Sequence, residues 1–308
     1  MASGSTPVPP AGFVGLGTLG APIAERLMSG GVPLVVHNRD RAKAAPFLSA
    51  GATWADSPKE LGRQVGSGVV FVMVTDARAV RRVLFGRFGV LAGIRPGGLV
   101  VNLSTIAPDE SRTLATRLAS RGVHYLEAPV AGSVDAARQG ELLVFAGGDA
   151  ADLATARPLL ERFARGVEHL GPVGTAAAMK LVNNLVMVAT LAADAEALSL
   201  AESLGLPGGR VVDLLLAGGG ASRALEGKRD AFLRRDYATK FKLSLADKDL
   251  GLVARAAREV GARAPIAREA KRLADEAVRA GLGDRDLSAM LEAARARRRP
   301  DATTAAPP

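Results

Sequence analysis

The sequence contains no cysteine, only three histidines and few aromatic residues, which make up 4% of its 308 residues. Without cysteine there is no disulfide framework, no thiolate nucleophile and no cysteine-ligated zinc or iron–sulfur site. The histidines, at positions 37, 124 and 169, lie far apart, so a histidine-rich metal site is not expected. The scarcity of aromatics removes the stacking platforms that bind single-stranded nucleic acid. We therefore expect neither a metal site nor a nucleic-acid partner.

Long hydrophobic runs are also missing. The first twelve residues lack the charged and apolar regions of a signal peptide. The most apolar part of the longest expected helix, Leu185–Ala193, has 9 residues, against about 20 for a membrane span. Hydrophobic residues still make up 48% of the chain, which is enough for real cores. We expect a soluble, cytoplasmic, globular protein without membrane contact.

Negative charge is in deficit, and the formal net charge is +9. Four of these charges come from the arginines at 295, 297, 298 and 299, beside a segment that ends in DATTAAPP. A solvated surface with a basic tail explains this surplus better than a nucleic-acid site, because no aromatics accompany the arginines. We expect residues 297–308 to be a disordered basic tail.

The first half of the chain alternates short β-rich runs with helical segments. This alternation predicts an α/β fold with a doubly wound parallel sheet. The candidate strands are Gly12–Gly15, Pro33–His37, Val69–Val74, Leu99–Leu103, His124–Glu127, Leu142–Ala146 and Glu168–Leu170.

From about Gly174 onward the pattern becomes helical, beginning with one long candidate helix over Ala176–Leu204. Further candidate helices are Gly209–Leu216, Ser244–Val260, Ile266–Ala280 and Asp286–Ala296. We expect a nucleotide-binding α/β domain over 1–172 and an all-α domain over 173–296. The long helix would join them.

The strongest local motif is G-x-G-x-x-G between a candidate strand and a candidate helix. Its residues are Gly15, Leu16, Gly17, Thr18, Leu19 and Gly20. Such glycines permit a tight turn, close approach of a pyrophosphate and close helix–strand packing, with the helix N-terminus facing the phosphates. The alternative is an incidental glycine turn, because glycine is frequent in this chain.

The end of the second candidate strand bears on the choice of cofactor. NAD sites usually carry an acidic residue there, whereas this chain has Asn38 followed by Arg39. A guanidinium can bind the 2′-phosphate of NADP through two hydrogen bonds, so NADP is favoured. Asp40 would repel that phosphate unless it turns away, so NAD stays possible. Arg39 could also be an ordinary exposed turn residue.

Other candidates follow later strands, whose carboxyl ends are where such sheets bind ligands. We expect Val74 and Thr105 to contact the cofactor, and Ser104 and Thr105 to contact substrate. Ser104 or Thr105 could also cap the next helix, and both roles can hold together. The small residues Ala131, Gly132 and Ser133 could present backbone N–H groups to a substrate carboxylate, although an ordinary turn fits equally well.

Lys180 and Asn184 are spaced one helical turn apart and share an apolar stripe. Polar groups there are costly to bury without partners, and desolvation lowers the pKa of a lysine towards that of a proton donor working near neutral pH. The alternative is a lysine that extends to solvent beside two helix-bending asparagines. For Lys248 and Asp249, an ordinary solvated pair is the better interpretation from spacing alone.

Taken in order, these segments resemble the β-hydroxyacid dehydrogenase family, relatives of 3-hydroxyisobutyrate dehydrogenase, from about Gly12 to Leu291. The branch most similar is that of the NADPH-dependent glyoxylate and succinic semialdehyde reductases. The motifs are GFVGLGTLG, NLSTIAPDE, EAPVAGSVDAARQGEL, GPVGTAAAMKLVNN, FKLSLADKDL and GLGDRDLSA. The resemblance implies a Rossmann domain, a helical domain, and assembly into dimers or tetramers.

The resemblance also implies roles for residues. Lys180 would be the general acid that protonates a carbonyl as hydride arrives from the nicotinamide, and Asn184 would bind substrate and hold that lysine. By the same resemblance, Thr105 and Lys248 would contact the cofactor. Phe241 would line the substrate pocket and Asp249 would support it, with Gly132 and Ser133 receiving the carboxylate.

One position departs from the family pattern, because Ala131 stands where a serine usually contacts substrate. The resemblance then implies a bulkier or less polar substrate than glyoxylate. An NADPH-dependent imine reductase is one alternative, although that group usually has Asp or Tyr where this chain has Lys180. A second is a non-enzymatic NADP sensor or nucleic-acid-associated module, which would have no use for a buried proton donor.

Overall fold

The computed structural model describes residues 10–297, which form two compact units that divide after Lys180: residues up to Lys180 (unit 1) and residues from Leu181 onward (unit 2). The strands, all in unit 1, are β1 (Ala11–Val14), β2 (Leu34–His37), β3 (Thr53–Trp54), β4 (Val69–Val72), β5 (Leu99–Asn102), β6 (His124–Glu127), β7 (Val130–Ala131), β8 (Leu142–Ala146) and β9 (Ala164–His169). The α-helices of unit 1 are α1 (Gly20–Ser29), α2 (Ala45–Ser49), α3 (Pro58–Val65), α4 (Ala77–Phe85), α5 (Pro108–Ala119), α6 (Val134–Gln139) and α7 (Ala150–Leu160). Helix α8 (Thr175–Ser203) begins in unit 1 and ends in unit 2.

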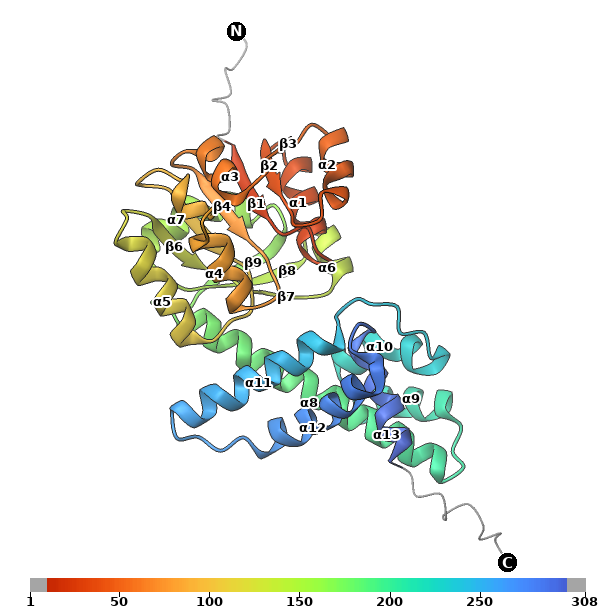
Figure 1. Ribbon diagram of the computed structural model, residues 1–308. Helices are drawn as coiled ribbons and strands as arrows, with labels where there is room; N and C mark the ends of the chain where they lie inside the picture. Colours follow the sequence, from red (N-terminus) through yellow and green to blue (C-terminus); the bar gives the residue numbers. More distant parts are fainter. Residues whose placement is uncertain (1–9, 298–308) are drawn as a thin grey trace, which may run out of the picture. The chain divides into compact units, whose positions relative to one another are not determined.

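The main sheet of unit 1 has the strand order β3-β2-β1-β4-β5-β6, and every pairing in it is parallel (Figure 1). This is the order of a Rossmann fold, so the expected doubly wound parallel sheet is confirmed. Strand β1 pairs with both β2 and β4, which makes the crevice beyond its carboxyl end the point where the strand order reverses. The fully buried β1, β4 and β5 read as continuous apolar runs because helices cover both faces.

A second, three-stranded sheet has the order β7-β8-β9. Strand β7 is antiparallel to β8, whereas β9 is parallel to it. The pattern of the sequence did not reveal β7, since two residues are too few for a recognisable alternation. It also placed the last strand at Glu168–Leu170, although β9 begins at Ala164; the arginine and glycine early in β9 conceal a strand that is half exposed.

Unit 2 is helical throughout its described part. Its further helices are α9 (Gly208–Ala217), α10 (Arg223–Arg234), α11 (Leu243–Glu259), α12 (Pro265–Ala277) and α13 (Met290–Ala296). Helix α10 was missed from sequence because it is strongly charged, although Ser222 caps it by accepting from the N–H of Leu225 (2.9 Å). The sequence places a domain boundary at 172/173, just before α8, whereas the two units divide within that helix.

Helix α8 is long and apolar enough to cross a membrane by length and composition alone. In unit 2, however, its residues Val188, Leu191 and Leu198 are buried in the hydrophobic core together with residues of α11, α12 and α13. One such helix is weak evidence for a membrane span, because a core helix passes the same length and hydropathy criteria.

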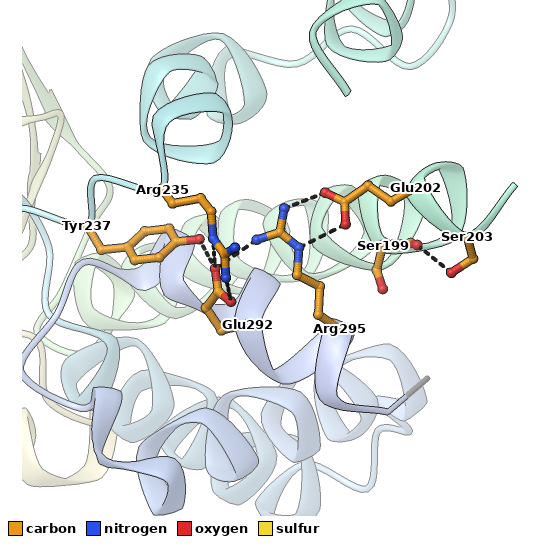
Figure 2. A network of polar contacts seen from close by, with 7 residues as sticks. All are labelled: Ser199, Glu202, Ser203, Arg235, Tyr237, Glu292 and Arg295. Carbon is orange, nitrogen blue, oxygen red and sulfur yellow. Dashed lines mark hydrogen bonds and ion pairs between the residues drawn. The ribbon is translucent and has the colours of Figure 1, made fainter. Parts of the chain in front are cut away.

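The last turns of α8 are tied to α13 by a network of ion pairs (Figure 2). The guanidinium of Arg295 donates to both carboxylate oxygens of Glu202 and to Glu292, which also accepts from Arg235 and from the hydroxyl of Tyr237. Arg295 therefore belongs to the fold of unit 2, although its charge was counted with the tail. The expected tail lies outside the described residues except for Arg297, whose Nε donates to Glu276 (2.5 Å).

Candidate functional site

The turn between β1 and α1 is shaped by the three glycines of the motif. Gly15 has φ +106°, and a Cβ there would lie 2.0 Å from the carbonyl oxygen of Met73. A Cβ at Gly20 would lie 2.0 Å from the carbonyl oxygen of Gly15. At Gly17, by contrast, a Cβ would meet nothing within 4 Å. The outer glycines thus permit the turn itself, whereas the middle one leaves open space where a phosphate could approach.

Helix α1 opens on this space without a side-chain cap on its first turn, because its N-cap residue is Leu19. N–H groups at the start of a helix, together with the helix dipole, favour an anion. This end of α1 suits the pyrophosphate of a dinucleotide, as the motif predicts.

The loop after β2 holds Asn38 against the glycine turn. The Oδ1 atom of Asn38 accepts from the N–H of Leu16 (3.1 Å), and its Nδ2 donates to the carbonyl of Asp40 (2.8 Å). The Asp40 carboxylate accepts from the N–H of Ala42 (3.1 Å), which caps the short 3₁₀ helix that follows. The Asp40 carboxylate therefore serves as a helix cap. Arg39 is exposed at the same bend.

Polar groups at the ends of β4 and β5 bond to one another. The N–H of Val74 donates to Oγ of Ser104 (2.9 Å), and the N–H of Ser104 donates to Oδ1 of Asn102 (3.1 Å). Thr105 follows, half-buried, in the same loop. The alternative that Ser104 or Thr105 caps the next helix is wrong, because the N-cap of α5 is Ala107, whose N–H donates to Glu110 (3.0 Å).

The structure thus gathers the glycine turn, the Asn38 loop and the Ser104 loop along the carboxyl ends of adjacent strands β2, β1, β4 and β5. Crevices at this edge of an open parallel sheet are the usual ligand sites. The segment Ala131–Ser133 follows the carboxyl end of β6: Ala131 is paired with Leu143 in the second sheet, and the Ser133 hydroxyl caps α6 by accepting from the N–H of Ala136 (3.1 Å).

Lys180 and Asn184 both lie on α8, and the lysine is half-buried. Asn184 is only 1% exposed, and its Nδ2 donates to Oδ2 of Asp249 on α11 (2.6 Å). The Nδ2 of Asn183 donates to Oδ1 of Asn184 (3.0 Å), which fixes the orientation of that amide. The buried amide is therefore held at both ends, through one of its two N–H donors and one of its two acceptor lone pairs.

The pair Lys248 and Asp249 differs from the sequence-based expectation. Asp249 is 2% exposed and forms an ion pair with Lys248 (2.8 Å) while it holds Asn184. The interpretation as an ordinary solvated pair is wrong because the carboxylate points into the core of unit 2. Phe241 is half-buried against that core, and its N–H donates to the buried Asp286 (3.0 Å).

Three buried polar residues of unit 1, Ser111, Tyr125 and Glu127, were not predicted from the sequence. Asn102, Ser111 and Glu127 are at most 2% exposed, and Tyr125 is 4% exposed. The Oε1 atom of Glu127 accepts from the N–H groups of Gly174 and Ala176 at the start of α8, each at 2.8 Å. The sequence did offer one sign of this cluster: a glutamate ends the expected strand His124–Glu127, and a buried carboxylate needs hydrogen-bond partners.

Two family models together match almost all of the described chain. The NAD-binding domain of 6-phosphogluconate dehydrogenase matches residues 10–171, and the NAD-binding domain of NADP-dependent 3-hydroxyisobutyrate dehydrogenase matches residues 174–294. Among curated proteins, glyoxylate/succinic semialdehyde reductase 2 of Arabidopsis thaliana is 33% identical over 285 residues, covering 92% of this chain and 79% of its own.

Solved structures agree with these matches. The 3-hydroxyisobutyrate dehydrogenase of Salmonella typhimurium superposes with a TM-score of 0.85 at 30% identity, covering 92% of this chain and 98% of its own. A structure of Psf3 in complex with NADP+ and 2-OPP gives a TM-score of 0.84 at 31% identity, covering 92% of this chain and 99% of its own.

Proposed function

This chain belongs to the β-hydroxyacid dehydrogenase family and is an NAD(P)-dependent oxidoreductase, and from that premise we propose that it interconverts a small β-hydroxyacid and its aldehyde or ketone, with Lys180 as general acid and base. The observation that carries the proposal is the placement of Lys180 and Asn184 one turn apart on α8. Asn184 is held by the buried Asp249 (2.6 Å). A solvent-exposed lysine on an ordinary surface helix would not need a buried amide–carboxylate pair one turn away.

The residues divide the work of the reaction. A bound nicotinamide cofactor supplies or accepts the hydride. In reduction, the ammonium of Lys180 donates a proton to the carbonyl oxygen as negative charge develops there, and in oxidation its amine takes the proton of the hydroxyl. The amide of Asn184 hydrogen-bonds substrate and orients it towards Lys180. The backbone at Gly132 and Ser133 is proposed to receive the substrate carboxylate.

We propose NADP as the preferred cofactor. The residues after β2 suit a 2′-phosphate: Asn38 holds the loop to the glycine turn, the Asp40 carboxylate caps a helix, and Arg39 offers a guanidinium. Thr105, Val74 and Lys248 are proposed as further cofactor contacts. A solved relative in complex with NADP+ is consistent with this preference.

Replacing Arg39 tests the preference. In Arg39→Ala we expect kcat/KM with NADPH to fall about tenfold to a hundredfold, because a charge-assisted contact to phosphate is lost, while kcat/KM with NADH changes little. Arg41→Ala is the matched control, since it removes the same charge two residues further along the chain. The guanidinium of Arg41 lies over the ring of Trp54. Equal losses with both cofactors in Arg39→Ala would contradict a 2′-phosphate contact.

The substrate class is tested by a panel. Purified protein is assayed with NADPH and with NADH against glyoxylate, succinic semialdehyde, methylmalonate semialdehyde and a cyclic imine. Turnover of a carbonyl acid with NADPH is the expected result, and a bulkier acid than glyoxylate is favoured because Ala131 offers no hydroxyl. Turnover of the imine alone would assign the imine reductase class instead. Cofactor binding without turnover of any substrate would overturn the proposed dehydrogenase activity.

We further propose that the protein is a homo-oligomer, a dimer or tetramer, in the cytoplasm. Large apolar side chains of α8 are exposed in the single chain, including Val182 at 54%, Val186 at 62% and Leu200 at 59%. Exposed apolar side chains that follow one helix are typical of a surface that a partner covers. Light scattering is expected to give the mass of a multimer, and Leu200→Glu is expected to shift it towards the monomer. A wild-type monomer at micromolar concentration would contradict this.

A further inference from the structure

The first turn of α8 is capped by a side chain from a distant strand. An α-helix begins with four N–H groups that lack partners within the helix. Here Thr175 donates to the carbonyl of Pro172 (3.2 Å), whereas Gly174, Ala176 and Ala177 all donate to Oε1 of Glu127 (2.8, 2.8 and 3.3 Å). One buried carboxylate therefore satisfies most of the helix start, and the positive end of the helix dipole favours its charge.

The other oxygen of Glu127 begins a chain of hydrogen bonds that runs through buried side chains. Ser111 donates its hydroxyl proton to Oε2 of Glu127 (2.5 Å), so the hydroxyl of Tyr125 must be the donor in its 3.0 Å contact with Ser111. Tyr125 in turn accepts from Nδ2 of Asn102 (3.1 Å). Each bond points towards Glu127 because a carboxylate can only accept.

The direction of this chain decides how the amide of Asn102 is oriented. With Nδ2 facing Tyr125, its Oδ1 accepts from the N–H of Ser104 (3.1 Å), and Oγ of Ser104 accepts from the N–H of Val74 (2.9 Å). The chain of hydrogen bonds thus ends in the two loops at the carboxyl ends of β4 and β5. If every hydrogen bond in it ran the other way, Nδ2 of Asn102 would face the N–H of Ser104, and two donors would meet.

We infer that Glu127 is a positioning residue for Lys180, and that the same carboxylate fixes the loop of Ser104. Ala176, held by Glu127, lies one turn before Lys180 on the same face of α8, so a shift of this turn moves the lysine. Burial raises the pKa of the Glu127 carboxyl, while the bonds from Ser111 and the helix start oppose that rise. The inference rests on the proposed function.

Glu127→Gln is the sharpest test, because it keeps the size of the side chain and removes only the charge and one acceptor. The amide of Gln would donate to Ser111 and reverse the direction of the hydrogen bonds through Tyr125 and Asn102. Two N–H donors would then face each other at Ser104. We expect kcat for the carbonyl acid to fall at least about tenfold, since a small misplacement of reacting groups has large effects on the chemical step. The KM and the Kd of NADPH should change by smaller factors than kcat, because the mismatch also reaches the loop of Ser104, and the isotope effect of deuterated NADPH on kcat should rise.

Two comparisons separate positioning from plain stability. Asp149→Asn is the matched control, because Asp149 also caps a helix of unit 1, by accepting from the N–H of Ala151 (2.7 Å). Its kcat should stay near wild type even where its melting temperature falls. In a Lys180→Ala background, Glu127→Gln should lower kcat by a clearly smaller factor than in wild type, because the lysine that it positions is gone and only the effect through the loop of Ser104 remains. Glu127→Asp, which retains the charge, should recover part of the activity.

The outcomes are distinguishable. If wild type turns over a carbonyl acid and Glu127→Gln loses no more kcat than the Asp149→Asn control, the positioning role is wrong. An equal fractional loss in the wild-type and Lys180→Ala backgrounds would also overturn it and leave only a structural cap. If wild type turns over nothing on the panel, the proposed function fails, and the role of Glu127 towards Lys180 fails with it.

Discussion

Lys180→Ala is expected to lower kcat for carbonyl reduction about 10²-fold or more, because proton donation by a positioned side chain contributes about 10²–10⁴ to such reactions. The Kd of NADPH should change little, since the proposed cofactor contacts, in the glycine turn and the Asn38 loop, do not include this lysine. Stopped-flow or steady-state oxidation of NADPH, with cofactor fluorescence for binding, measures both quantities. The loss should appear in kcat and kcat/KM alike, as expected for an interaction made in the transition state.

Two further variants make this result specific. Lys180→Arg keeps the positive charge but cannot release a proton near neutral pH, so it should be almost as slow as the alanine variant. Lys242→Ala is the matched control, because this lysine of unit 2 is 43% exposed and paired with Asp284 at the surface. A Lys180→Ala enzyme that retains wild-type kcat would exclude Lys180 as the proton donor.

The sequence was most informative where a local pattern alone decides the structure. The glycine motif, the apolar runs of β4 and β5 and the 29-residue helix α8 each follow from rules that need no distant contacts. It was least informative for β7, whose two residues form a strand only because β8 lies beside them. Helix α10 was not predicted for a related reason: most of its residues are charged or exposed, and only Leu225 and Phe232 are buried.

The candidate site divides in the same way. Lys180 and Asn184 could be picked from their spacing on one helix, and Asn38 from its place after a strand. The burial of Asp249 could not be predicted, because its partner Asn184 is 65 positions away along the chain. Glu127 was missed because its function as a cap depends on N–H groups 47 to 50 positions away. Contacts of that range are set by the tertiary fold, which spacing within one segment does not encode.

The glycine turn allows the fold and the ligand to be tested separately. Gly15→Ala should destabilise unit 1 by about 3 kcal/mol or more, because a residue with φ +106° is strained and its Cβ would lie 2.0 Å from the carbonyl oxygen of Met73. Gly17→Ala should leave the melting temperature unchanged or slightly higher, since its Cβ meets nothing within 4 Å and alanine restricts the unfolded chain. Thermal unfolding without cofactor measures both.

The same Gly17→Ala variant should nevertheless raise the Kd of NADPH at least about tenfold, because the added methyl would occupy the space through which a pyrophosphate reaches the backbone. Gly209→Ala, an equally open glycine in unit 2, is the matched control and should leave the Kd unchanged. Isothermal titration with NADPH distinguishes the two variants. Tight binding by Gly17→Ala would mean that the phosphates do not pass over this turn, and the open space at Gly17 would then need another explanation than a dinucleotide.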